Sequence, residues 1–485
     1  MEKIKSVKKN YLYNMIYKMF LIIVPILVTP YISRVLGASG SGQYSYTYSI
    51  TTYFTLFASL GFDNYAQRLI ASHQNDKKNQ SIDFWEIFIV RLIPVFSTLI
   101  VYYLLIIFNV FGMKYTKLMW ILSINIISVM FNIVYFFQGN EEFGIIIFRN
   151  IFIKFLSIVA IFTLVKGEKA IIIYTFIEAL SILFSNLSLW GYLPKYLTKI
   201  RFVDLHPLRH IGPTFVLFLP TIATSVYTAL DKTMIGIITH SDLENGNYEY
   251  AEKLVKMSMT IITSLSTVMI ARNSRNFALK KYDLIKKNIY MSCKFVLFLG
   301  IPICFGLIAV ADNMIPWYLG NDYEKAASLV KVLSPLVIII GFSNVFGFQF
   351  LIPCHMDYRY TLSVLFGAFT NFIINIFLIK IAGAHGAAIS TIISEFVVTF
   401  SMYIFVKKYI DIKEMLVPAF KYLFSGATMF FVLKHISLFL IPSVMNTVGI
   451  VLCGMIIYTT VLYILRDEFI KQVESYFKSI FRRKV

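Results

Sequence analysis

The sequence predicts an all-α integral membrane protein with about fourteen transmembrane helices. Hydrophobic residues make up 58% of the chain and charged residues only 15%, whereas about one quarter of the residues of a soluble domain are charged. Apolar runs of about 20 residues, long enough to cross a hydrocarbon layer of about 30 Å, recur along the chain. The net charge of +19 comes from basic residues in short segments between these runs, which argues against a nucleic-acid-binding face.

The first apolar run follows a basic N-terminal segment, as in a secretory signal peptide. We expect it to remain as a transmembrane helix, because it is too long for a signal peptide and no small-residue cleavage site follows it. The predicted spans cover residues 11–36, 44–70, 85–108, 117–138, 145–165, 170–193, 213–238, 249–271, 288–311, 326–352, 357–380, 385–406, 419–440 and 444–466.

The distribution of basic residues predicts the orientation of these spans. With a cytoplasmic N-terminus, about 26 basic residues fall in inside segments and about 5 in outside loops, as the positive-inside rule requires. The inside groups include Lys77 and Lys78, the segment 195–209, the segment 272–287, and Lys407, Lys408 and Lys413. Both termini are therefore expected in the cytoplasm.

The connecting loops leave no room for a soluble catalytic domain, since none exceeds about 20 residues. No phosphate-binding loop of the G-x-x-x-x-G-K-[ST] type is present. The four cysteines, Cys293, Cys304, Cys354 and Cys453, lie singly in apolar surroundings and suggest small core residues rather than metal ligands. We expect no cofactor and no metal site.

Two short matches suggest that the first six spans are repeated in the next six. Residues 42–46 (Gly-Gln-Tyr-Ser-Tyr) resemble residues 246–250 (Gly-Asn-Tyr-Glu-Tyr), a register that pairs Arg68 with Arg272. Residues 170–178 align with residues 387–395, which pairs Glu178 with Glu395. Because six is even, the two halves should be related by an axis along the membrane normal. The predicted division is an N-terminal lobe (1–205), a C-terminal lobe (206–418), two further helices (419–466) and a basic cytoplasmic tail (467–485).

Polar side chains form stripes along several of the predicted spans. One face of the eighth span carries Glu249, Lys253, Lys256, Thr260, Thr263 and Thr267 at helical spacing. Similar stripes are Asn14, Lys18, Thr29 and Ser33 in the first span, Ser45, Ser49, Thr52, Ser59, Asp63 and Gln67 in the second, and Thr221, Thr224, Thr228 and Asp231 in the seventh. Lipid does not solvate such faces, so these four spans are expected to line a water-accessible cavity.

Charged residues also lie well inside the apolar runs: Arg91, Arg149, Lys154, Glu178, Asp231, Lys232, Lys294 and Glu395. Each costs at least about 2.5 kcal/mol at the bilayer centre unless it is paired or hydrated, so each is a candidate functional residue. Structural roles remain open for several. Lys253, Lys294 and Arg149 could extend toward the interface, Glu178 and Glu395 could be buried acceptors, and Asp231 could pair locally with Lys232.

These residues resemble a known family. Ser33, Arg34, Gly37, Gly40, Gly42, Tyr44, Gly61 and Arg68 are similar to the opening of bacterial polysaccharide-unit flippases, the O-antigen and capsule branch of the superfamily that includes the multidrug and toxin extrusion transporters. Asp231, Ile235 and Gly236, and then Asn371, Asn375, Gly383, residues 386–389 and Glu395, resemble its later helices. One departure is Ala271: at the position before the arginine, which is Arg272 in this chain, many relatives have a proline.

The resemblance implies two six-helix lobes in a V-shaped, pseudo-twofold arrangement around a cationic cavity. The implied activity is translocation of an undecaprenyl-diphosphate-linked oligosaccharide from the cytoplasmic to the outer leaflet of the bacterial plasma membrane by alternating access, for surface polysaccharide synthesis. On this hypothesis the protein is a transporter rather than an enzyme. Its partners would be the lipid-linked sugar, membrane lipid and the polysaccharide polymerase and chain-length machinery.

Specific residues can be assigned to this hypothesis. Arginine and lysine offer charge-assisted hydrogen bonds to a diphosphate, and hydroxyl and amide side chains replace water around sugars. The candidates for substrate contact are Arg34, Arg68, Lys253, Lys256, Arg272, Lys18, Arg149, Thr260 and Asn371. If transport is coupled to H⁺ or Na⁺, the candidate sites are Asp231, Glu178 and Glu395.

Three alternatives belong beside this hypothesis. A drug exporter of the same superfamily would require an acidic cavity, whereas these stripes are mixed to basic. A flippase for the peptidoglycan precursor would use similar chemistry. A membrane-embedded polymerase or glycosyltransferase would need a large outer loop or a carboxylate-rich site, and neither is present in the sequence.

Overall fold

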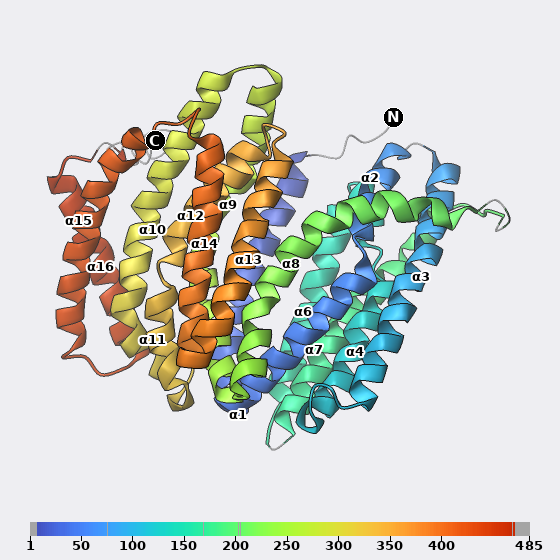
Figure 1. Cartoon of the computed structure of the whole chain (residues 1–485), viewed down its shortest axis with the longest axis horizontal. Coiled ribbons are helices and arrows are strands. Elements are labelled where there is room, and N and C mark those ends of the chain that lie inside the picture. Colours follow the sequence, from blue (N-terminus) through green and yellow to red (C-terminus); the bar gives the residue numbers. More distant parts are fainter. Residues whose placement is uncertain are drawn as a thin grey trace, which may run out of the picture. The chain divides into compact units, whose positions relative to one another are not determined.

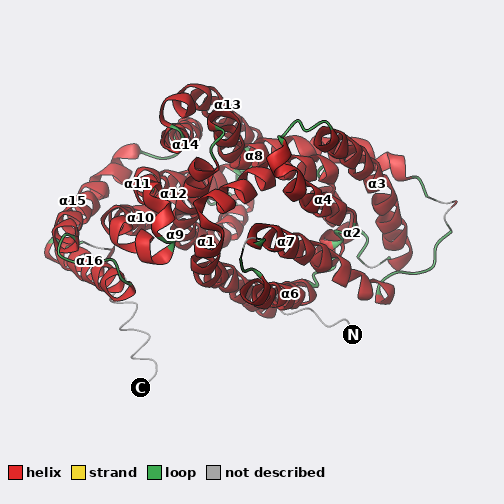
Figure 2. Cartoon of the chain, turned by 90° about the horizontal axis from the view of Figure 1, so that it is seen from below, coloured by secondary structure: helices red, strands yellow, loops and turns green. Residues whose placement is uncertain are grey.

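The computed structural model describes residues 7–74, 76–167, 169–201, 203, 205–467 and 469–470. Within these residues every regular element is a helix (Figure 2), so the predicted all-α class is confirmed. The side chains of residues 7–19, 21–22, 216–217, 219–221, 223–227, 412–413 and 415–418 lie outside the described part. Asn14, Lys18, Thr221 and Thr224 of the predicted stripes are among them.

The chain folds as two compact units. Unit 1 comprises residues 1–236 and 241–245, and unit 2 comprises residues 237–240 and 246–485. Figure 1 traces the helices in sequence order from blue to red. The helices of unit 1 are α1 (Val7–Ser59), α2 (Phe62–Ser72), α3 (Lys77–Ile107), α4 (Thr116–Met130), α5 (Val134–Gly139), α6 (Phe143–Leu164), α7 (Ala170–Leu187) and α8 (Ile211–Thr239), with short 3₁₀ turns at Met113–Tyr115, Ser188–Gly191, Leu193–Lys195 and Pro207–His210.

Helix α1 contains two predicted spans and the connection between them. Its backbone departs from helical geometry at Gly37 (φ 64°, ψ 177°), a left-handed φ that glycine adopts without a steric penalty. The chain is helical again from Ala38 onward, so Gly40 and Gly42 are helical.

The second predicted span is interrupted between α1 and α2. Gly61 has a φ of 71°, and a Cβ atom added there would lie 3.0 Å from the Cα atom of Phe218. The break therefore serves both a left-handed turn and a close approach of helix α8.

Helix α8 packs on unit 1, which places the unit boundary later than residue 205. The hydroxyl groups of Ser49 and Thr233 are 2.8 Å apart, and the rings of Phe57 and Phe218 are 5.9 Å apart. The predicted division, in which residues 206–418 form the C-terminal lobe, stays a prediction. The repeat of the first six spans in the next six also stays a prediction.

Unit 2 contains a second set of long helices. They are α9 (Asp242–Ala278), α10 (Tyr282–Tyr318), α11 (Glu324–Leu333), α12 (Leu336–Phe346), α13 (Asp357–Ala382), α14 (Ala384–Val406), α15 (Ile412–Ser437) and α16 (Val444–Ile464), with a 3₁₀ turn at Asn321–Tyr323 and the π-helix η7 at Gly347–Leu351. A bend of 45° separates the α11 and α12 segments, and Pro335 lies in the break, as expected where proline removes a backbone donor.

Ten helices in the described part are long and apolar enough to cross a membrane, and eleven if the bent pair forms one span. Helix α1 counts as one of these, although it contains the first predicted span and most of the second. Helices α8 and α15 are not among the ten, but they coincide with two more predicted spans. The prediction of about fourteen spans is compatible with this arrangement. The protein is an integral membrane protein.

Candidate functional site: a polar cavity in unit 1

A cavity of about 500 Å³ lies among the helices of unit 1. Helices α1, α2, α5, α6 and α7 and the α4–α5 break contribute its walls. The lining residues are Phe20, Asp63, Asn132, Val134, Tyr135, Gln138, Arg149, Asn150, Ile153, Lys154, Glu178, Ser181, Ile182, Ser185 and Asn186. Four of these are charged, two of each sign, so this cavity is mixed in charge, and the cationic cavity between the lobes that the resemblance implies stays a prediction.

Helical spacing explains why two neighbouring helices direct polar groups into the cavity. On α6, Asn150 and Lys154 are four residues apart and share a face, and Arg149 directly precedes Asn150. On α7, Glu178, Ser181, Ile182 and Ser185 repeat at intervals of three and four. The opposite faces of both helices carry large apolar residues, including exposed Phe152, Phe155 and Phe184, as expected for surfaces that contact lipid.

Lys154 and Glu178 form an ion pair on the cavity wall. The Lys154 ammonium donates to both carboxylate oxygens of Glu178, at 2.9 and 3.0 Å. Their side chains are 32% and 18% exposed, so the pair is partly desolvated but open to the cavity. The interpretation of Glu178 as an acceptor is therefore confirmed in geometry, while its role in ion coupling stays a prediction.

A second charged network lies where α4 ends and α5 begins. Arg91, which is 1% exposed, donates to the Asp63 carboxylate at 2.8 Å and to the Asn132 carbonyl at 2.5 Å. Its guanidinium also lies 4.9 Å from the Tyr135 ring centroid. The helix break frees backbone carbonyl groups, and the arginine satisfies one of them where water is excluded.

Arg149 completes the wall beside the ion pair. Its guanidinium donates to the backbone carbonyl of Ser185 on α7, and the Ser185 hydroxyl donates to the Asn150 amide oxygen at 3.2 Å. Arg149 is 6% exposed, so it is a buried member of the cavity and not an interfacial side chain.

A smaller cavity of about 230 Å³ adjoins the first and shares Asn132, Ile182 and Asn186 with it. Its other lining residues are Tyr48, Thr51, Thr52, Thr55, Asn125, Ser128 and Val129. Hydroxyl and amide groups therefore line both cavities. Such groups replace the hydrogen bonds that a carbohydrate loses when it leaves water.

Three further site candidates of unit 1, Arg34, Arg68 and Asp231, are not among the lining residues of either cavity. Arg34 and Arg68 are exposed on α1 and α2. Asp231 is 6% exposed on α8. For Lys18 only the backbone is described.

In unit 2, the predicted stripe on α9 is partly engaged by its own helix. Lys256 pairs with Glu252 at 2.6 Å, Lys253 lies 5.5 Å from the Tyr250 ring centroid, and the Thr260 hydroxyl donates to the Lys256 carbonyl at 3.2 Å. Hydroxyl groups in helices often bond in this way. Arg272 is exposed at the far end of the helix.

Two other candidates of unit 2 are more enclosed. Asn371 is fully buried between α13 and α14, where its amide oxygen accepts from Asn375 at 3.0 Å, so a substrate has no access to it in this conformation. Glu395 is half-buried on α14. The convergence of the unit 2 candidates with those of unit 1 stays a prediction.

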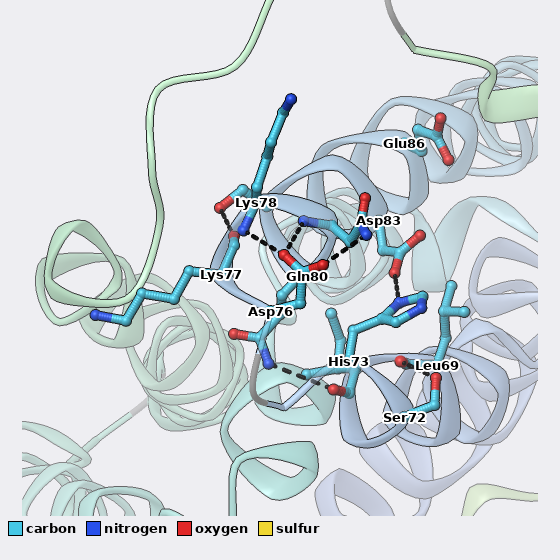
Figure 3. Close-up of polar contacts among 12 residues, drawn as sticks. Leu69, Ser72, His73, Asp76, Lys77, Lys78, Gln80, Asp83 and Glu86 are labelled. Carbon is cyan, nitrogen blue, oxygen red and sulfur yellow. Dashed lines mark hydrogen bonds and ion pairs between the residues drawn. The ribbon is translucent and has the colours of Figure 1, made fainter.

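The sequence interpretation missed a buried ionic cluster at the start of α3. Figure 3 shows His73 facing Asp83, with a distance of 2.6 Å between Nδ1 and Oδ2. Glu86, one turn later, is 2.7 Å from His210 Nε2, and the guanidinium of Arg209 contacts both carboxylates at 3.1 and 2.6 Å. Through these contacts the segment before α8 packs against α3.

Three members of this cluster have metal-ligating side chains. Asp83, Glu86 and His210 are buried, with one potential ligand atom each within 4.8 Å of the others. Because the Arg209 guanidinium bonds both carboxylates, the arrangement is an ion-pair network. Two acids three residues apart beside an apolar run were the available sequence signal, but spacing could not identify their partner 126 residues away.

Comparison with known proteins is consistent with this geometry. Residues 7–277 match the family described as "Polysaccharide biosynthesis protein". A protein of Escherichia coli (strain K12) named "Putative O-antigen transporter" is 22% identical over 83% of this chain and 97% of its own length. Among solved structures, the lipid II flippase MurJ in an inward closed conformation has a TM-score of 0.65 at 15% identity, covering 92% of this chain and all of the other. An inward-facing multidrug resistance transporter of the MATE family has a TM-score of 0.60 at 11% identity, covering 85% and 99%.

Proposed function

Because this chain belongs to the polysaccharide biosynthesis protein family, we propose that it is a flippase that moves a lipid-linked oligosaccharide across the bacterial plasma membrane. The substrate class is an undecaprenyl-diphosphate-linked repeat unit, transferred from the cytoplasmic to the outer leaflet by alternating access. No bond is made or broken in this reaction, so the protein acts as a transporter.

The polar cavity of unit 1 is the observation that carries this proposal. A sugar unit presents many hydroxyl groups, each costing roughly 2–7 kcal/mol when it is desolvated without a partner. The hydroxyl and amide groups of Thr52, Asn132, Asn150 and Asn186 line space where such bonds can be remade. An apolar bundle without these groups would offer the sugar no path.

The diphosphate requires cationic groups along the same path. Lys154 and Arg149 line the cavity, and each charge-assisted hydrogen bond to a phosphate contributes about 1.5–3 kcal/mol. Arg34, Arg68, Lys253, Lys256 and Arg272 remain the proposed contacts outside it, with Lys18, and Thr260 and Asn371 remain proposed sugar contacts. The polyprenyl tail would stay in lipid, with the largely apolar helices α15 and α16 as its proposed neighbours.

Ion coupling would act through the carboxylates. Protonation of Glu178 would remove the ion pair with Lys154 and leave the ammonium available for the diphosphate, which links a proton to substrate binding at one pair of residues. Asp231 and Glu395 are the other proposed sites for H⁺ or Na⁺. Both termini are proposed to be cytoplasmic, and the polymerase and chain-length machinery to be functional partners.

A peptidoglycan-precursor flippase is the second candidate, because MurJ has a similar fold and its substrate is named lipid II. The test is a deletion strain of the organism, in which lipid-linked sugar is measured on each leaflet. Accumulation of the oligosaccharide lipid on the cytoplasmic leaflet, reversed by the wild-type gene but not by a Lys154→Ala, Arg149→Ala variant of equal abundance, is expected. Accumulation of lipid II instead would establish the second candidate and contradict the first.

A further inference from the structure

Unit 2 contains a pocket of about 460 Å³ where α9 ends and α10 begins. Its lining residues are Phe277, Tyr282, Asp283, Ile285, Lys286, Phe350, Cys354, Met356 and Tyr409. Its inner wall is buried, with Phe350 at 5% and Cys354 at 8% exposure. Phe350 belongs to the π-helix η7, a backbone form that often occurs at functional sites.

A second pocket of about 310 Å³ adjoins it, and the two share Lys286 and Tyr409. This second pocket is cationic, because it is lined by Lys286, Lys407 and Lys408 and by a single carboxylate, Asp411. All three lysines are exposed. Among the described residues no ion pair joins any of them to a carboxylate.

The two pockets are held together by specific contacts. The backbone N–H of Asp411 donates to the Tyr290 hydroxyl at 2.7 Å, which fixes the α14–α15 connection against α10. The rings of Phe350 and Tyr409 are 5.3 Å apart, and Lys286 lies 5.7 Å from the Tyr290 ring centroid. The lysines and the aromatic pocket are therefore parts of one built surface.

We propose that this surface, defined by Lys286, Lys407, Lys408 and the aromatic pocket behind them, binds an anionic phospholipid of the surrounding membrane. The headgroup phosphate would contact the three ammonium groups, and one acyl chain would enter the pocket lined by Phe277 and Phe350. The site lies where α10 begins and α14 ends, at the depth where headgroups meet hydrocarbon.

Charge complementarity selects this occupant. Three unpaired ammonium groups favour a phosphate, and a buried aromatic cavity favours an apolar chain, so a ligand with both parts satisfies the surface as a whole. Lysines that only orient the protein in the membrane need no adjoining cavity. A free phosphate ion would leave the 460 Å³ pocket unfilled.

Retention of lipid by the purified full-length protein provides the first test. Protein released from nanodiscs of phosphatidylcholine and phosphatidylglycerol is examined by native mass spectrometry. The wild type should retain phosphatidylglycerol preferentially, and the variant K286Q/K407Q/K408Q should lose this preference by roughly tenfold or more. The matched control K77Q/K78Q/K195Q removes three exposed lysines from unit 1 and should retain the lipid as the wild type does.

Chemical labelling of Cys354 tests whether the bound lipid enters the pocket. In a variant that keeps Cys354 and carries Cys293→Ser, Cys304→Ser and Cys453→Ser, maleimide labelling should be several-fold slower in vesicles that contain phosphatidylglycerol than in phosphatidylcholine alone. Adding inorganic phosphate to the latter vesicles should leave the rate unchanged. Equal retention by the two triple-lysine variants would overturn the proposal, and so would equal protection of Cys354 by inorganic phosphate, which would indicate a phosphate site instead. Neither measurement involves transport, so a negative result would contradict the lipid site without contradicting the flippase proposal.

Discussion

The Lys154 ammonium donates to both carboxylate oxygens of Glu178, at 2.9 and 3.0 Å, across two neighbouring helices on the wall of a polar cavity. Each residue alone would be an isolated charge inside an apolar helix. Together they are neutral while they stay paired, and each becomes available to a ligand when the pair opens. This relationship allows a structural and a transport role to be separated by experiment.

We expect single changes at this pair to reduce transport more than abundance. Lys154→Ala should lower translocation of the lipid-linked sugar roughly tenfold or more, because one charge-assisted contact to the diphosphate contributes about 1.5–3 kcal/mol. Glu178→Ala should also lower it, because it removes the proposed proton site. The measurement is surface polysaccharide in a complemented deletion strain, normalised to protein in the membrane. The exchanged variant Lys154→Glu, Glu178→Lys preserves the pair but reverses its position. Full transport by this variant would show that the pair is only structural.

The cluster at the start of α3 should contribute to stability. Arg209→Gln leaves the carboxylates of Asp83 and Glu86 without their shared guanidinium, and we expect a loss of about 1–3 kcal/mol, reduced by the partial exposure of Arg209. Thermal unfolding of the protein in detergent measures this change. Arg201→Gln, on the same connecting segment, is the control and should unfold as the wild type does. Similar unfolding of the two variants would show that the cluster contributes nothing measurable.

The stripe on α9 is expected to be part of the substrate path. Lys256→Ala should lower transport roughly tenfold while the protein still inserts, and Lys253→Glu with Lys256→Glu should be worse, because like charges would face the diphosphate. Glu252→Gln tests the observed Lys256–Glu252 pair and should preserve transport. Normal surface polysaccharide in a well-expressed strain with both glutamates would mean that this stripe is structural.

The orientation follows from the loop charges and can be measured directly. Reporter fusions after Lys78, Lys287 and Lys413 should be cytoplasmic, whereas fusions near Asn245 and Asn321 should be external. A cytoplasmic signal from the fusion at Asn245 would contradict the predicted topology.

Labelling of Cys354 should depend strongly on pH. Burial raises the pKa of its thiol to about 11, so the neutral form is favoured in the folded protein. The stabilisation from this preference is complete below the ordinary cysteine pKa and is lost as the pH rises through about 11. Near neutral pH, alkylation should be roughly a hundredfold slower than at a Ser274→Cys control in a protein without other cysteines. Equal rates would show that the pocket is open to water.

The amino-acid sequence by itself determined the helical membrane class and the approximate positions of the spans. The bilayer enforces this outcome, because lipid-exposed backbone must satisfy its hydrogen bonds within a helix and each helix must match the hydrocarbon thickness. Breaks were harder to locate: the interruptions at Gly61 and after Met130 depend on contacts with α8 and with Arg91.

Only the tertiary structure decided which charges meet. Lys154 and Glu178 are 24 residues apart, Asp63 and Arg91 are 28 apart, and Asp83 and Arg209 are 126 apart. None of these separations is a helical repeat, because each pair joins different elements. The rotation of each helix about its axis, set by side-chain packing against its neighbours, determines which of its polar groups face a partner and which face a cavity.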